Sequence, residues 1–128
     1  MADQLKARVL LVDDEARFVE ILAERLQMRG VTADSATSGE EALKLVKERD
    51  YDAVLLDLNM PGMDGTDTLR EIKKVKPSSQ VIILTGQGSI KATVEVMKEG
   101  AMDFMEKPVD INKLIDKLKE AVFKQGGR

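Results

Sequence analysis

Hydrophobic residues gather in five short runs along the chain, and stretches of helical spacing separate the runs. Residues 8–12 form a continuous run rich in branched side chains, which is typical of a strand buried on both faces of a sheet. Residues 53–56 and 81–84 repeat this pattern, and residues 102–105 form a shorter run. Residues 31–36 are more polar, so we expect this strand at an edge of the sheet.

Between the runs, apolar residues recur every three or four positions, as on one face of a helix. Gly30 and Gly100 are expected to end helices, Ser38 with Glu41 to form a capping box, and Asp110 to cap the last helix. Five helices are predicted, with apolar faces at Phe18, Ile21, Leu22 and Leu26; Ala42, Leu43 and Val46; Leu69, Ile72 and Val75; Ile90, Val94 and Met97; and Ile111, Leu114, Ile115, Leu118 and Val122.

Alternating strands and helices with short links predict an α/β fold, in which helices cover both faces of a parallel sheet. Five such units fit a doubly wound, flavodoxin-like sheet with strand order 2-1-3-4-5. The length of 128 residues suits one domain, which we expect to have an ordered core over about residues 6–123 and a tail or linker at 124–128.

Composition narrows the function classes. The net charge is −3 without a long basic run, so the charge pattern gives no support for nucleic-acid binding. Cysteine is absent, which excludes disulfides and thiolate metal sites. No apolar run approaches the roughly 20 residues that span a bilayer, and the first residues are polar. We therefore expect a cytoplasmic protein that does not contact membranes.

Polar residues follow the ends of four strands. Asp13 and Asp14 come after the first, Asp57 ends the third, Thr85 ends the fourth and Lys107 follows the fifth. In this fold these strand ends meet at one edge, beside the crevice between strands one and three. Like charges about 4 Å apart repel by roughly 4 kcal/mol at an effective dielectric near 20. Three carboxylates there predict a hard cation such as Mg2+.

The same positions carry a family resemblance that covers nearly the whole chain. The Asp13-Asp14 pair, Asp57 with the segment 60–65, the turn 84–86 and Lys107-Pro108 together resemble the CheY-like receiver domains of bacterial response regulators in two-component signalling. A weaker likeness of residues 97–108 is to receivers attached to AAA+ enhancer-binding transcription activators. That likeness is incomplete, because Met102 stands where an aromatic residue is common.

The resemblance implies phosphoryl transfer. Asp57 is the expected phosphoacceptor, which attacks the phosphohistidine of a sensor histidine kinase or phosphotransfer protein. Asp14, Asp57 and the main-chain carbonyl of Asn59 are expected to hold Mg2+, or Mn2+ in its place, with Asp13 acting through a water. The bond before Pro108 is expected to be cis. The domain would catalyse its own phosphorylation and dephosphorylation, and not the turnover of a metabolite.

The resemblance also implies a switch. Thr85 and Lys107 are expected to bind the phosphoryl oxygens, and Thr85 then moves inward while Phe104 rotates. The output surface is expected on the fourth helix, fifth strand and fifth helix, where it controls an output domain or a downstream protein. A dimer that depends on phosphorylation is also expected. Asn59 and Gln87 are expected to tune the lifetime of the phosphoryl group.

Several alternatives remain open on the residues alone. Asp13 and Asp14 could cap a helix, and Lys107 could be an ordinary surface lysine. A flavodoxin-like cofactor site is disfavoured by the acids at 13–15, which repel a phosphate. A haloacid dehalogenase-type phosphatase needs Asp-x-Asp after the first strand, which Asp13-Asp14-Glu15 does not match. A P-loop nucleotide hydrolase is excluded because the sequence lacks the Gly-rich phosphate loop that ends in Lys and Ser or Thr. A degenerate receiver that acts only as a docking module is the remaining rival.

Overall fold

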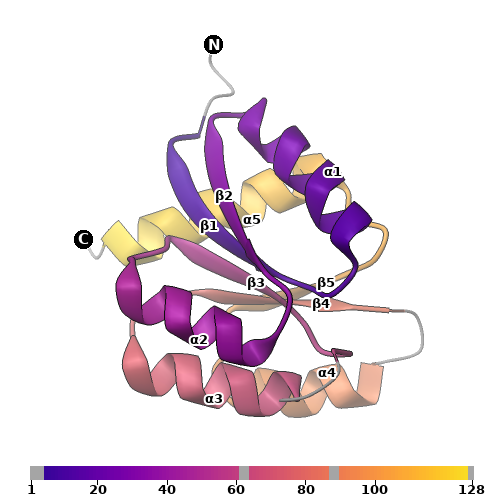
Figure 1. Ribbon diagram of the computed structural model, residues 1–128, viewed down its shortest axis with the longest axis vertical. Coiled ribbons are helices and arrows are strands. Elements are labelled where there is room, and N and C mark those ends of the chain that lie inside the picture. The colour runs from indigo at the N-terminus through magenta and orange to yellow at the C-terminus, as the bar shows by residue number, and fades with distance from the viewer. Residues whose placement is uncertain (1–4, 61–63, 87–89, 127–128) are drawn as a thin grey trace.

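The strands of the protein form one parallel sheet in the computed structural model, which describes residues 5–60, 64–86 and 90–126 (Figure 1). Strand order is β2-β1-β3-β4-β5, as the sequence predicts, and β2 lies at an edge. The strands are β1 (Ala7–Val12), β2 (Val31–Ala36), β3 (Ala53–Asp57), β4 (Val81–Thr85) and β5 (Asp103–Glu106). The observed β5 begins one residue later than expected.

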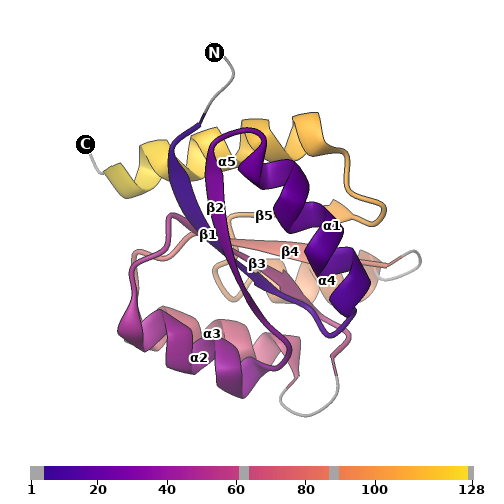
Figure 2. The same ribbon diagram turned by 45° about the horizontal axis from the view of Figure 1, so that its top comes forward.

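Helices cover both faces of the sheet. Figure 2 shows α1 and α5 on one side and α2, α3 and α4 on the other. The described helices are α1 (Ala16–Gln27), α2 (Gly39–Glu48), α3 (Gly65–Val75), α4 (Ile90–Met97) and α5 (Ile111–Gly126). α5 therefore includes residues 124–126, the first part of the expected tail. None of the helices in the described part of the chain has the length and hydrophobicity to cross a lipid bilayer.

Alternate residues of each central strand enter two separate cores. In β1, Val9 and Leu11 pack against α1 and α5, whereas Leu10 and Val12 pack toward α2, α3 and α4. All four are at most 2% exposed. Because successive strand residues point to opposite faces, an uninterrupted apolar run is what a strand between two helical layers requires. This packing on both faces fixes where the strands end, at one edge of the sheet.

Side-chain caps fix the starts of three helices. The Ser38 hydroxyl accepts a hydrogen bond from the backbone N–H of Glu41 at 3.1 Å, as predicted. The return half of the capping box differs, because the Glu41 carboxylate accepts from the N–H of Thr37 at 2.7 Å. Asp110 caps α5 through its Oδ1, and Asp64 caps α3. At helix ends, Gly30 and Gly100 have φ of 84° and 107°, which favours glycine.

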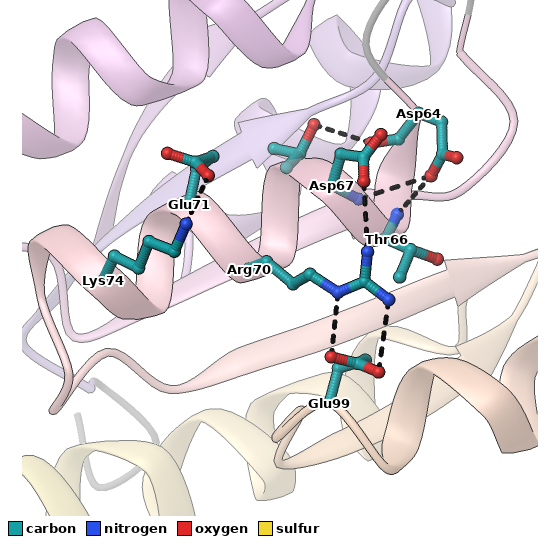
Figure 3. Close-up of polar contacts among 8 residues, drawn as sticks. Asp64, Thr66, Asp67, Arg70, Glu71, Lys74 and Glu99 are labelled. Carbon is teal, nitrogen blue, oxygen red and sulfur yellow. Dashed lines mark hydrogen bonds and ion pairs between the residues drawn. The ribbon is translucent and has the colours of Figure 1, made fainter.

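An arginine on α3 connects this helix to the turn after α4 (Figure 3). Arg70 donates from Nε and Nη2 to the two carboxylate oxygens of Glu99, at 2.9 and 3.3 Å. Its Nη1 also lies 3.2 Å from Asp67 Oδ1. This two-pronged geometry fixes the direction of the guanidinium group as well as its distance. The contact therefore restrains the C-terminal end of α4 relative to α3.

The buried face of α1 differs in part from its predicted face. Leu22 and Leu26 are buried as expected, and Phe18 is half-buried. Ile21, however, is 45% exposed, and Val19 is buried instead. Helical spacing alone allows either Val19 or Ile21 to lie beside Leu22, because the two flank the same stripe. Packing against the sheet selects Val19.

The predicted face of α4 is wrong at its centre. Val94 is 50% exposed and Met97 is only half-buried, whereas Thr93 and Val96 are the buried positions. Ile90 belongs to α4, but its side chain lies outside the described part of the structure. The helix is thus rotated so that a threonine faces the sheet and a valine faces outward. This rotation leaves an apolar strip on the surface beside β5.

Candidate functional site

Three carboxylates meet at the carboxyl edge of the sheet. Asp57 is the last residue of β3, and Asp13 follows β1 directly. Because Val12 pairs with Leu56 in the parallel register, Asp13 and Asp57 leave the sheet side by side. Asp13 is 1% exposed and Asp57 is 4% exposed. The more exposed Asp14 completes the group, and one oxygen from each of the three acids lies within 4.8 Å of the others.

Backbone hydrogen bonds orient both buried carboxylates. Asp13 Oδ1 accepts from the N–H of Glu15 at 2.9 Å, and Asp57 Oδ1 accepts from the N–H of Asn59 at 3.1 Å. The N–H of Asp13 donates to the carbonyl of Ala36 at 3.0 Å, which ties the loop to β2. One oxygen of each carboxylate is thereby held by the chain, and Oδ2 is left for other partners.

Lys107 is the cation of the site. Its Nζ lies 2.7 Å from Asp13 Oδ2, 2.8 Å from Glu15 Oε1 and 3.6 Å from Asp57 Oδ2. It also lies 4.6 Å from the centre of the Phe18 ring, within the range of a cation–π contact. The Lys107 side chain is only 18% exposed. The peptide bond from Lys107 to Pro108 is cis.

Thr85 lies at the end of β4 beside a surface hollow. The residue is 3% exposed, and its carbonyl oxygen accepts the backbone N–H of Lys107 at 2.8 Å. The hollow has a volume of about 470 Å³ between α4 and β5. Phe104, which is 42% exposed, forms part of its wall. The other wall residues are Thr93, Val94, Met97, Lys98 and Glu106.

Burial and charge act in opposite directions on the site. Burial raises the pKa of Asp57, the Asn59 N–H lowers it, and the nearby Asp13 carboxylate raises it further; the net shift is upward. For Lys107, burial alone lowers the pKa, but hydrogen bonds to Asp13 and Glu15 outweigh it and the pKa is raised. Lys107 is therefore firmly charged, whereas the Asn59 N–H and Lys107 offset only part of the cost of burying the ionised Asp57 carboxylate.

The donor set fits a hard cation. Asp13, Asp14 and Asp57 supply only carboxylate oxygens, which suit Mg2+ better than a metal that prefers nitrogen or sulfur. Oxygens around a six-coordinate Mg2+ lie about 3.0 to 4.2 Å apart, given bonds of about 2.1 Å. The observed limit of 4.8 Å needs only a small contraction to reach that spacing.

Most of the expected site residues have a described position. Asp13, Asp14, Asp57, Thr85 and Lys107 come together at the strand ends as described above. Asn59 is exposed next to them, whereas Gln87 lies outside the described residues. The contact of Glu15 with Lys107 was not anticipated from the sequence. Its only sequence signal is a third acid after Asp13-Asp14, which by itself indicates no partner 92 residues away.

Comparisons with known proteins agree with this geometry. Residues 9–119 match the response regulator receiver domain family. The chain is 41% identical over 114 residues to transcriptional regulatory protein ZraR of Klebsiella oxytoca, covering 89% of this chain and 26% of that protein. It is 39% identical over 116 residues to transcriptional regulatory protein GlrR of Escherichia coli, covering 91% and 26%. The chain thus spans about a quarter of the length of these relatives.

Solved structures show the same fold. A response regulator receiver domain protein from Clostridium thermocellum superposes with a TM-score of 0.89 at 35% identity, covering 94% of this chain and 97% of that one. NtrX from Brucella abortus superposes with a TM-score of 0.88 at 32% identity, covering 95% of this chain and 28% of that one. The sequence match, the sheet order and the strand-end acids agree: the chain belongs to the response regulator receiver domain family of two-component signalling.

Proposed function

We propose that the domain accepts a phosphoryl group on Asp57 from a phosphohistidine of a partner kinase or phosphotransfer protein. The observation that supports this most directly is the convergence of the Asp13, Asp14 and Asp57 carboxylates beside the Lys107 ammonium. An Asp57 oxygen forms a bond to phosphorus while the bond from phosphorus to the histidine nitrogen breaks. The nitrogen retains the electron pair, and Asp57 becomes an aspartyl phosphate.

Mg2+ is the proposed cofactor, and Mn2+ is its proposed substitute. Asp14, Asp57 and the main-chain carbonyl of Asn59 would hold the ion, and Asp13 would act through a water. When bound, the ion supplies positive charge that offsets the carboxylates and the phosphoryl oxygens. The upward pKa shift of Asp57 supports this role, because ionised Asp57 lacks full compensation from the protein alone.

Lys107 and Thr85 are the proposed ligands of the phosphoryl oxygens. Lys107 Nζ is already 3.6 Å from Asp57 Oδ2, so a phosphoryl oxygen on Asp57 needs only a short shift to reach it. Thr85 supplies a hydroxyl donor from the adjacent strand end. Such fixed charges and donors account for most of the catalytic contribution of a protein to phosphoryl transfer. Asn59 and Gln87 are the proposed regulators of aspartyl phosphate lifetime.

The hollow between α4 and β5 supports a switch. Thr85 and Phe104 both line the hollow, so an inward movement of Thr85 would vacate space that the Phe104 ring could enter. Output would pass through the surface of α4, β5 and α5. The likeness to the transcriptional regulatory proteins ZraR and GlrR supports a transcription-activating output domain of the AAA+ enhancer-binding type. A dimer that forms on phosphorylation is part of the same proposal.

A docking module that works without phosphorylation is the less favoured function. Such a module has no need for a buried carboxylate pair held against a lysine. Asp13 and Asp57 are both nearly inaccessible, although isolated charges are costly to bury. Their retention at the strand ends, with Lys107 between them, supports the phosphoacceptor function instead.

The test is intact-mass measurement after incubation with Mg2+ and acetyl phosphate. The unmodified protein should gain one phosphoryl group that hydroxylamine removes, and Asp57→Asn should gain none. Asp116→Asn, which changes an exposed acid on α5, is the matched control and should react normally. If no adduct forms, beryllofluoride binding is measured next. Binding would indicate rapid hydrolysis, and its absence would overturn the proposal.

A further inference from the structure

Glu15 has an unusual position at the start of α1. It is the N-cap residue of this helix, a position where the shorter side chain of Ser, Thr, Asp or Asn ordinarily accepts a hydrogen bond from the first turn. The Glu15 side chain makes no such bond. Its Oε1 instead lies 2.8 Å from Lys107 Nζ, while its backbone N–H donates to Asp13 Oδ1. The residue thus uses both its backbone and its side chain on the phosphoacceptor site.

Because of this contact, the N–H donors of the Lys107 ammonium are shared among three carboxylates. The ammonium has three N–H donors, and it lies closer to Asp13 and Glu15, at 2.7 and 2.8 Å, than to Asp57, at 3.6 Å. Asp13 is buried and held by the backbone. The Glu15 side chain is 64% exposed, so it can leave without moving the chain. Of these partners, Glu15 is therefore the one that can most easily be displaced.

We propose that Glu15 is a positioning residue that holds Lys107 in the resting state and competes with the phosphoryl oxygens for it. The proposal rests on the phosphoacceptor function of Asp57. When the phosphodonor arrives, Lys107 exchanges the Glu15 carboxylate for a phosphoryl oxygen, and Glu15 turns toward solvent. Glu15 thereby weakens binding of the phosphodonor and sets how readily the domain accepts a phosphoryl group.

Two substitutions separate the contact from simple charge repulsion. Glu15→Gln removes the charge and weakens the hold on Lys107. Glu15→Asp keeps the charge but is one methylene shorter, so it also loses the contact. Glu20→Gln removes an equal charge from an exposed position on the same helix and is the matched control. Competition for Lys107 predicts that both Glu15 variants change, whereas repulsion alone predicts a change in Glu15→Gln only.

The experiment measures beryllofluoride affinity at saturating Mg2+, and initial rates over a range of acetyl phosphate concentrations. Both Glu15 variants should lower the beryllofluoride Kd and the acetyl phosphate KM by roughly threefold to fivefold, the range of a partly exposed ion pair, with a smaller change in kcat. Glu20→Gln should match the unmodified protein. If Glu15 only stabilised α1, its substitution would not lower KM while leaving kcat nearly unchanged.

Each other outcome is decisive. Unchanged Kd and KM in both variants, or an increase in either, would overturn the competition, as would an effect confined to Glu15→Gln. These results are distinct from failure of the phosphoacceptor function itself. In that case the unmodified protein would bind no beryllofluoride and gain no phosphoryl group.

Discussion

The backbone N–H of Lys107 donates a 2.8 Å hydrogen bond to the carbonyl oxygen of Thr85. This bond extends the parallel ladder of β4 and β5 by one step beyond the Thr85–Glu106 pair. The proposed phosphoryl-binding cation and hydroxyl are therefore fixed to each other through their backbones. This bond keeps the two strand ends in register, so we expect the Thr85 hydroxyl and the Phe104 ring to carry the response to phosphorylation at this edge.

Thr85 is expected to transmit phosphorylation to Phe104 through its hydroxyl. Beryllofluoride with Mg2+ should shift the ring resonances of Phe104 in NMR spectra of the unmodified protein and of Thr85→Ser. Thr85→Ala should bind beryllofluoride but show a much smaller shift, because no hydroxyl pulls the residue inward. An equal shift in Thr85→Ala would show that Phe104 responds by another route.

Lys107 is expected to stabilise the fold as well as to bind the phosphoryl group. Lys107→Ala leaves the buried Asp13 carboxylate without its cation, which should lower the free energy of unfolding by about 3 kcal/mol or more in metal-free buffer. Denaturant unfolding measures this loss. Lys113→Ala, at an exposed position on α5, is the control and should change stability little. A loss no larger than that of the control would contradict the prediction.

The pH dependence of stability should reveal Asp57. Burial raises the pKa of Asp57 in the folded protein, so the folded protein holds the Asp57 proton more tightly than the unfolded chain does. The stability that Asp57 contributes is present below its unfolded pKa of about 3.9 and is lost as pH rises through the folded pKa. Asp57→Asn should therefore melt higher than the unmodified protein near pH 7 without metal, and the difference should shrink toward pH 4. A difference that does not change with pH would argue against this assignment.

Mg2+ should raise the melting temperature, because it binds the folded protein and not the unfolded chain. At 100 times its Kd, a ligand of this kind stabilises the folded state by about 2.7 kcal/mol. Differential scanning fluorimetry with increasing Mg2+ measures the effect. Asp14→Asn should weaken it and Asp116→Asn should not. Equal responses in the two variants would place the ion elsewhere.

Gly65 is expected to tolerate no side chain. A Cβ at this position would lie 2.7 Å from Leu58 Cδ2 and 2.8 Å from Leu58 Cα, in the segment that follows Asp57. Gly65→Ala should lower stability by about 1 to 3 kcal/mol and slow phosphorylation, because the backbone after Asp57 has to shift. Gly86→Ala is the control for stability, since no heavy atom of the described residues, its chain neighbours apart, lies within 4 Å of its added Cβ. Equal stability of the two variants would refute the prediction.

The fold follows from the sequence because its central strands are buried on both sides. A run such as Leu55-Leu56 must be apolar without interruption, and the residue that ends it must be polar at the open edge. The acid cluster was predictable for the same reason, since parallel strands deliver their last residues to one place. Family resemblance then gave each acid a role that its position alone does not define.

Side-chain detail was less predictable. Apolar spacing gives the period of a helix but not its rotation, so Val94 was expected on the buried side of α4 and Thr93 took that place. Ser38 caps its helix as predicted, but the Glu41 carboxylate accepts from the N–H of Thr37 and not from that of Ser38. The contact between Glu15 and Lys107 joins residues from opposite ends of the chain, and only the assembled sheet edge brings them together.

The two-pronged contact between Arg70 and Glu99 should make the junction between α3 and the end of α4 sensitive to ionic strength. Both side chains are partly exposed, so dissolved ions screen their attraction. The Lys107 ion pair with Asp13 is mostly buried and is screened far less. High salt should therefore loosen the junction between α3 and the end of α4 while the acid site keeps its arrangement. We therefore expect the ionic strength of the solution to change how firmly the end of α4 is held against α3, without any change in phosphorylation.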